Sequence, residues 1–314
     1  MNDDELLVQI LVPWRPHEIA NLFQRKGGSG IEEVTVVRTQ PTKVFIVRAL
    51  IFAVVYAVVE SLYRFAGLGT ISVAFWVSAF VAGVLFALVL GYIFSRVAFR
   101  LSVRIAMAWL ALFIIEQFSN LVEGYFFTTQ IPTTTLFLAA TTVSLAVTFV
   151  QALLVGILFT PKEPLNSIVA EARDYFGQRP WYSWLWRIVL CSAVYFPIYF
   201  TFGGIVSPIV LPYYTESSSG LGLRVPSFEV MVPLELLRGF LYVIALLPLL
   251  VALRIRRRAL YAATVSLLYV TGALGPFLID ETLPVLLRTV HGIEILADYV
   301  VFGAVIVHLL GRRS

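Results

Sequence analysis

Eight long apolar segments constrain the fold of this chain more than any other feature of its sequence. Each is long enough for an α-helix to cross the roughly 30 Å hydrocarbon core of a bilayer, which takes about 20 residues. We place them at about residues 44–64, 70–94, 104–127, 135–159, 184–206, 229–253, 259–279 and 285–310. The sequence therefore predicts an all-α polytopic membrane protein, with an eight-helix transmembrane domain over residues 44–314.

The composition excludes a water-soluble fold on independent grounds. Hydrophobic residues make up 59% of the 314 residues and charged residues only 13%, and the mean hydropathy is +0.88. Typical soluble domains are about 45–50% apolar and about 25% charged. A chain this apolar has too little polar surface to cover a body that faces water. We therefore interpret the net charge of +4 as a topology signal and expect no nucleic-acid partner.

Basic residues between the apolar segments predict the orientation. With both termini placed in the cytoplasm, all but four of the 23 Lys and Arg residues lie in cytoplasmic segments; the four are Arg64, Arg224, Arg238 and Arg288. Membrane proteins concentrate Lys and Arg on the cytoplasmic side, and an odd number of spans would destroy this asymmetry. We expect a multi-pass protein of the cell membrane. The acidic start MNDDELL has no basic region like that of a cleavable signal peptide, so we expect the first span to direct insertion.

Residues 1–43 form the one sizeable polar segment. An apolar stretch at 6–12, a helix after Pro16, a glycine-rich stop at 27–30 and an alternating stretch at 32–38 predict a small cytoplasmic α/β cap. The glycines follow a helix and lack the spacing of a phosphate-binding loop, so we interpret them as a turn. This cap and the 160–183 loop, with its amphipathic helix near 166–176, are candidate docking surfaces for a protein partner. Membrane lipids are the other expected partners.

Three of the predicted spans carry ionisable or polar residues, which inside a membrane are costly and usually functional. Each set has helical spacing that keeps it on one face. The sets are Glu116, Asn120 and Glu123 in the third span, Glu235 and Arg238 in the sixth, and Arg288, His291, Glu294 and Asp298 in the eighth. The predicted topology puts all three sets at a similar depth. We expect them to line one connected substrate or ion cavity that opens toward the outer side.

The charge balance of this predicted cavity is acidic. With Glu60 of the first span included, the cavity would hold six carboxyl groups and two arginines. We therefore expect some carboxyl groups to be protonated or a cation to be bound. We also expect a carboxylate beside each arginine. The alternative is a structural network of local ion pairs that only holds helices together. One histidine in the cavity and one cysteine, Cys191, are too few for a zinc site of the usual kind. We predict no metal and leave the cofactor open.

The stretch LELLRGFL at 234–241 resembles the first motif of the CAAX-protease-like (CPBP) intramembrane family, E-E-x-x-x-R-G, over eight residues. It departs from that motif at Leu234, which replaces the paired glutamate, and Glu235 stands only three residues before Arg238. No Phe-x-x-x-His follows, and Ile295 occupies the position four residues after His291. The resemblance therefore does not assign the chain to that family.

Three functions fit these patterns. The first is a proton- or cation-coupled transporter of a small or anionic solute, with the acids relaying protons and the arginines holding a carboxylate or phosphate. The second is a membrane-embedded hydrolase or transferase that acts on a lipid-linked substrate, with His291 and a carboxylate as acid and base. The third is a non-catalytic subunit or assembly factor of a membrane complex. No internal sequence repeat and no complete catalytic motif is visible, so the sequence leaves open whether the protein is an enzyme.

Overall fold

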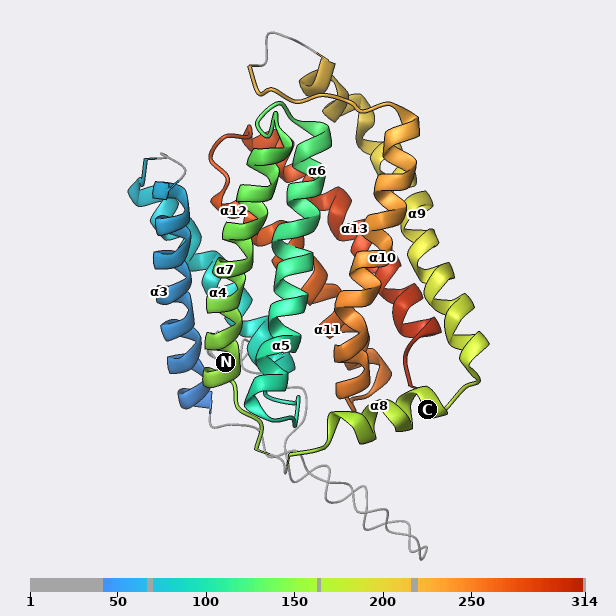
Figure 1. Cartoon of the computed structure of the whole chain (residues 1–314). Helices are drawn as coiled ribbons and strands as arrows, with labels where there is room; N and C mark the ends of the chain where they lie inside the picture. The colour runs from blue at the N-terminus through green and yellow to red at the C-terminus, as the bar shows by residue number, and fades with distance from the viewer. Residues whose placement is uncertain (1–41, 67–69, 163–164, 216–219, 313–314) are drawn as a thin grey trace, which may run out of the picture. The chain divides into compact units, whose positions relative to one another are not determined.

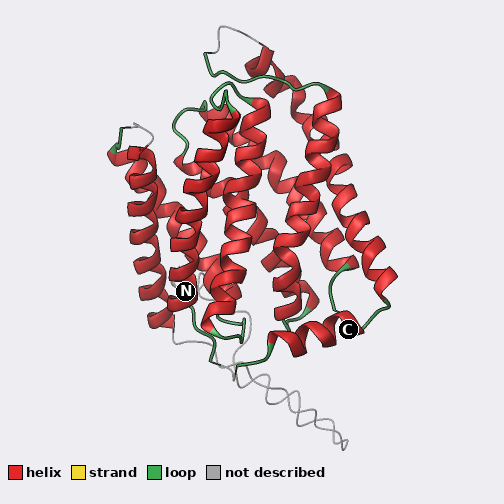
Figure 2. Ribbon diagram, in the orientation of Figure 1, coloured by secondary structure: helices red, strands yellow, loops and turns green. Residues whose placement is uncertain are grey.

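The computed structural model describes residues 42–66, 70–162, 165–215 and 220–312. Within these residues, every regular element is a helix, as Figure 2 shows, and one isolated β-bridge joins Thr128 to Leu223. The chain divides into two units, 1–38 and 39–314, and the fold below concerns the second. The predicted α/β cap, apart from its last two residues, lies outside the described residues and stays a prediction.

Eight helical spans in the described part are long and apolar enough to cross a membrane, which confirms the predicted multi-pass membrane protein. Their ends agree with the predicted ends to within three residues, with one exception in the fifth span. The helices are α3 (Thr42–Ala66), α4 (Val73–Phe94), α5 (Leu101–Leu112) continued by the π-helix η1 (Phe113–Phe118) and α6 (Ser119–Phe127), α7 (Thr134–Leu158), α9 (Trp181–Thr215), α10 (Phe228–Ala252), α11 (Arg257–Tyr269) continued by the π-helix η3 (Val270–Leu274) and α12 (Gly275–Ile279), and α13 (Val285–Leu309).

Successive spans run in opposite directions through the bundle (Figure 1). We name the end that holds Thr42 and Leu309 the inner end, after the orientation predicted from the basic residues, and the opposite end the outer end. The short helix α8 (Ile168–Gly177) runs across the inner end. It coincides with the amphipathic helix predicted near 166–176.

The fifth span is longer than predicted because its prolines do not end the helix. Helix α9 continues to Thr215, whereas the apolar pattern predicts an end near 206, and it contains Pro197, Pro208 and Pro212. A proline has no N–H to donate to the carbonyl four residues earlier. The hydroxyl of Ser207 donates to the Gly204 carbonyl (2.9 Å), the group that Pro208 leaves without its backbone donor. Such side-chain substitutes are how membrane helices tolerate proline.

The third and seventh spans each contain a π-helix, and the two π-helices pack against each other. A π-helix disturbs the regular pattern of backbone hydrogen bonds and is frequent at functional sites. The Asn120 side chain donates to the carbonyls of Glu116 (2.7 Å) and Gly272 (3.2 Å). This asparagine therefore ties η1 to η3 in the middle of the bundle.

The second four spans repeat the helix pairing of the first four. Helix α3 packs on α4 and α7, and α5 packs on α7; likewise α9 packs on α10 and α13, and α11 packs on α13. A glycine allows close approach in both halves. A Cβ added at Gly83 would lie 2.8 Å from the Ala53 Cα, and one added at Gly239 would lie 2.2 Å from the Ser192 carbonyl oxygen. The two halves therefore share these three helix pairings, although no sequence repeat is visible.

At the inner end, arginines connect α8 to the ends of the neighbouring spans. Arg312 contacts Glu171 (2.9 Å) and Asp174 (2.6 Å) of α8, and Arg254 contacts the same two acids. Tyr175 of α8 donates its hydroxyl to the Leu310 carbonyl. Burial raises the pKa of Tyr175, so the phenol stays protonated and remains a donor. These contacts hold α8 across the carboxyl ends of α10 and α13.

Candidate functional site

A buried arginine organises the polar residues of the outer half. Arg238 of α10 donates to both carboxylate oxygens of Glu235 at 3.0 Å, and its other terminal nitrogen lies 2.7 Å from Glu123 of α6. The hydroxyl of Tyr242 accepts from the same nitrogen at 3.3 Å, and Tyr299 donates to Tyr242 at 3.1 Å. We name Glu123, Glu235 and Arg238 the outer ion cluster. Arg238 is 4% exposed and Glu235 is fully buried, whereas the Glu123 side chain is 31% exposed.

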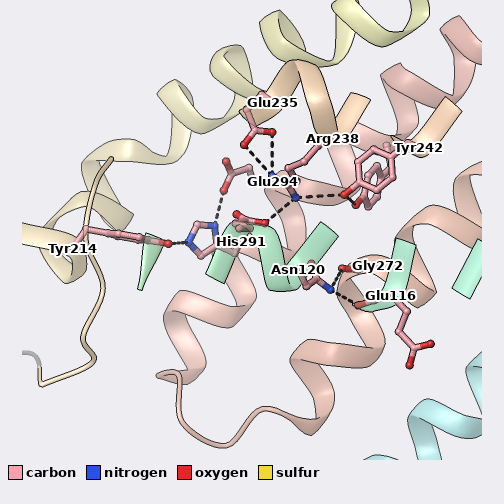
Figure 3. A network of polar contacts seen from close by, with 11 residues as sticks. Glu116, Asn120, Tyr214, Glu235, Arg238, Tyr242, Gly272, His291 and Glu294 are labelled. Carbon is pink, nitrogen blue, oxygen red and sulfur yellow. Dashed lines mark hydrogen bonds and ion pairs between the residues drawn. The ribbon is translucent and has the colours of Figure 1, made fainter. Parts of the chain in front are cut away.

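The second element of the site is a hydrogen-bonded pair on α13, drawn beside the outer ion cluster in Figure 3. Nδ1 of His291 lies 2.8 Å from a carboxylate oxygen of Glu294, one helical turn away. Nε2 of the same ring lies 3.3 Å from the hydroxyl of Tyr214, near the outer end of α9. The carboxylate and the phenol together fix the orientation of the imidazole ring. Glu294 is buried and His291 is partly exposed.

A cavity of about 250 Å³ is lined by this pair and by residues from the outer parts of α6, α9 and α10. We name it the outer cavity. Its lining includes the exposed side chains of Leu211 and Val225. Its walls contain four aromatic rings, and its polar groups include His291 and Glu294; the aromatic residues are Phe127, Tyr199, Phe200 and Tyr214. The volume lies just below the range of about 300–1,000 Å³ typical of small-molecule sites, so the cavity suits a small ligand.

Asp298 lies one turn further along α13 and is 1% exposed. Among the described residues, its Oδ1 has no hydrogen-bond partner. The charged groups of Glu294 and Arg238 lie close enough to interact electrostatically with the Asp298 carboxyl. Four acids, Asp298 and those of the outer ion cluster and the pair, therefore lie around one arginine.

Arg288 is separated from the other predicted residues of α13. Its Nη1 donates to the backbone carbonyls of Phe277 (3.1 Å) and Asp280 (2.5 Å), at the carboxyl end of α12. Within the described ranges it has no ion pair with a carboxylate, contrary to the expectation from charge balance. The physical reason is its position at the edge of the polar face, from which the long side chain reaches α12 instead of the bundle interior.

Glu116 also belongs to a different group. The Gln151 amide donates to Glu116 (3.1 Å) and to Glu60 (3.3 Å), and the Tyr56 hydroxyl donates to Glu116 at 3.4 Å. We name Glu60 and Glu116 the acid pair; both are buried. Glu116 Oε2 and Gln151 Oε1 are buried without a partner in the described part of the chain. The acid pair lies between α3, η1 and α7, whereas Glu123 faces α10.

The structure thus brings Glu123, Glu235, Arg238, His291, Glu294 and Asp298 together, and it does not place Glu116 or Arg288 among them. Asn120 lies between the two sets, where it joins the π-helices. Sequence reasoning missed the tyrosines around Arg238 and His291, and it missed Gln151. The spacing of two tyrosines is a signal that the sequence does contain. Tyr195 and Tyr199 are four residues apart, lie on one face of α9, and both face the Arg238 guanidinium.

The described residues contain no group of three or more His, Cys, Asp or Glu side chains placed to hold a metal ion. No protein-family model matches the chain, and the comparisons with curated proteins and with solved structures return no significant match. The geometry of the site is therefore what bears on the function.

Proposed function

We propose that the protein is a proton-coupled carrier of a small organic cation of the quaternary-ammonium type, bound in the outer cavity. One observation carries the proposal: the Glu294 carboxylate and four aromatic rings line the same cavity. Aromatic rings around a cation, assisted by a carboxylate, are the usual recognition of quaternary ammonium groups. Glu294 stands nine residues after Val285, about 14 Å along the helix axis. That is near the middle of a core roughly 30 Å thick, where transporters usually bind solutes.

An anionic solute, one of the options that the sequence leaves open, fits this cavity less well. Arg238 already binds two carboxylates and a phenol, and it is 4% exposed. Arg288 does not line the outer cavity. A ligand carboxylate or phosphate would therefore meet Glu294 without a free arginine to offset the repulsion.

The excess of acids supports coupling to protons. Glu123, Glu235, Glu294 and Asp298 lie around Arg238 and His291, and uncompensated charge inside a membrane is costly. Protons or a cationic solute have to balance this excess. A proton and a solute that neutralise the same carboxylate exclude each other, and this competition is what an exchanger needs.

The acid pair gives further support. Glu60 and Glu116 are buried around the Gln151 amide, the Gln117 amide also donates to Glu116, and neither acid has an ion pair among the described residues. Two bare carboxylates in such a site would lack the compensation that burial demands. We interpret the acid pair as the holder of a proton, next to the π-helix that leads to Asn120.

Transport into proteoliposomes tests this proposal. Purified full-length protein is reconstituted, and uptake of radiolabelled tetramethylammonium is measured with and without an imposed pH gradient. We expect uptake to follow the gradient and to fall about tenfold or more in Glu294→Gln, which removes a charge-assisted contact with the cation. Glu229→Gln is the matched control, because Glu229 is an exposed acid at the outer end that does not line the cavity.

Two results would overturn the proposal. The first is uptake by Glu294→Gln that equals wild-type uptake. The second is gradient-driven uptake of benzoate in preference to tetramethylammonium, which would restore the anionic solute.

A hydrolase or transferase is the second candidate, and one observation favours it. Glu294 orients His291 at 2.8 Å and leaves Nε2 beside Tyr214 at the cavity wall, which is how a general base is positioned. Release of inorganic phosphate from a fluorescent prenyl phosphate by wild-type protein in detergent, lost in His291→Gln, would support this function over transport.

A further inference from the structure

We infer that a second cavity, separate from the outer cavity, binds the headgroup of an anionic phospholipid from the outer leaflet. This cavity has a volume of about 450 Å³ and lies between α4, α12 and α13. We name it the lateral cavity. It shares no lining residue with the outer cavity. Arg288 and Gly292 of α13 line it, whereas His291 and Glu294 of the same helix line the outer cavity.

The lateral cavity opens toward lipid. Two of its lining side chains on α13, Val285 and Ile293, are 70% and 63% exposed. Apolar side chains that are exposed on a membrane-spanning helix contact acyl chains, because burial in lipid is as favourable for them as burial in protein. A ligand that enters here therefore arrives from the bilayer, with its chains beside Val285 and Ile293.

The polar end of the cavity carries a cation that has no ion pair with a carboxylate of the described residues. The Arg288 guanidinium is held by two backbone carbonyls at the end of α12, and its Nε is buried with no hydrogen-bond partner among the described residues. The nearby Asp280 carboxylate accepts instead from the backbone N–H of Thr282 (2.7 Å) and from its hydroxyl (2.6 Å). Arginine recognises phosphate oxygens through charge-assisted hydrogen bonds, so a phosphodiester matches this unsatisfied charge.

The depth of Arg288 fits a lipid headgroup. It stands three residues after the start of α13, about 5 Å along the helix axis from the outer end. Lipid phosphates lie at this boundary between the hydrocarbon core and the polar region. Ser78, five residues after the outer end of α4, also lines the cavity and supplies a hydroxyl group to a headgroup.

Native mass spectrometry of the full-length protein in detergent tests the inference. The protein is titrated with phosphatidylglycerol, with phosphatidylcholine, and with inorganic phosphate. We expect phosphatidylglycerol to bind at least about tenfold more tightly than phosphatidylcholine, and we expect Arg288→Gln to remove this preference. Arg224→Gln is the matched control, because Arg224 also donates to two backbone carbonyls at the outer end but does not line the cavity.

A second variant keeps the test valid if Arg288→Gln fails to fold. A Cβ added at Gly292 meets only ordinary contacts at 3.9 Å, so Gly292→Leu can place an apolar side chain in the lateral cavity while Arg288 keeps its charge. We expect it to weaken phosphatidylglycerol binding about tenfold as well. The inference is overturned if both variants bind phosphatidylglycerol like wild type, or if the two lipids bind equally. It is also overturned if inorganic phosphate competes at the same concentration as the lipid, which would identify a site for a soluble anion.

Discussion

Removing the charge of Arg238 is expected to destabilise the protein more than removing either of its acidic partners. Arg238→Met leaves Glu235, which is 0% exposed, without a cation. Breaking a buried ion pair from one side costs about 3–5 kcal/mol. Glu123 is 31% exposed, so the loss of its partner costs about 1 kcal/mol or less. Most of the predicted loss in the free energy of unfolding therefore comes from the unpaired Glu235 carboxylate.

The exposed fractions of Glu123 and Glu235 also predict the effect of replacing each acid. Glu235→Gln leaves Arg238 paired with Glu123 and keeps one amide oxygen that accepts from Nη1, so it removes one charged hydrogen bond and we expect an intermediate loss of about 1.5–3 kcal/mol. Glu123→Gln should cost about 1 kcal/mol or less. The double variant Arg238→Met with Glu235→Met removes both buried charges, and replacing a buried pair by apolar residues is nearly neutral.

Thermal unfolding of the purified protein in detergent measures this order. At about 2 °C per kcal/mol for a large chain, Arg238→Met should lower Tm by about 6–10 °C, and the double variant should recover most of that loss. Two results contradict the reasoning: a Tm for Arg238→Met no lower than that of Glu123→Gln, or a double variant no more stable than Arg238→Met alone.

Three further predictions concern the scaffold. Gly239→Ala should lower Tm by several degrees, because its Cβ would meet a backbone oxygen at 2.2 Å. Gly204→Ala has open space around it and should leave Tm unchanged. Equal Tm values for the two variants would contradict the close packing of α9 on α10. Arg312→Ala should speed the amide hydrogen exchange of α8 at least about threefold, because a partly buried ion pair that holds the helix is lost. Unchanged exchange would show that this ion pair does not stabilise α8. Cysteines placed at Glu281 and at Arg258 in a cysteine-free background should react with an impermeant maleimide from opposite sides, and labelling from one side would refute the topology.

The sequence predicts the spans well because hydropathy depends only on local composition. The error in α9 has a local cause as well: α9 continues through Pro208, and the Ser207 hydroxyl donates to the Gly204 carbonyl that Pro208 leaves without a backbone donor. A serine directly before a proline is a signal that hydropathy does not contain.

The candidate site was predictable where the helices are regular. Glu235 with Arg238, and His291 with Glu294, are each three residues apart on a regular α-helix, and both pairs form in the structure. Glu116 and Glu123 are seven apart, a spacing that an α-helix places on one face. The π-helix η1 contains Glu116 and changes the rotation per residue, so Glu116 turns toward α3 and α7. Periodicity alone does not reveal a π-helix.

The two halves of the bundle explain why no repeat is visible in the sequence. Gly83 and Gly239 occupy matching places, but the residue four positions before the glycine is Ala79 in α4 and Glu235 in α10. The shared helix pairing needs only small residues at the close contacts, so the other positions are free to differ. The first half consequently holds the acid pair, whereas the outer cavity is lined mainly by the second half, together with Phe127 of α6. Asn120 bonds to a π-helix of each half. The seventh span also packs closely on the eighth at this level, because a Cβ added at Gly272 would lie 3.0 Å from the Tyr299 hydroxyl. Asn120 therefore links the π-helix that carries Glu116 to the half that holds most of the outer cavity.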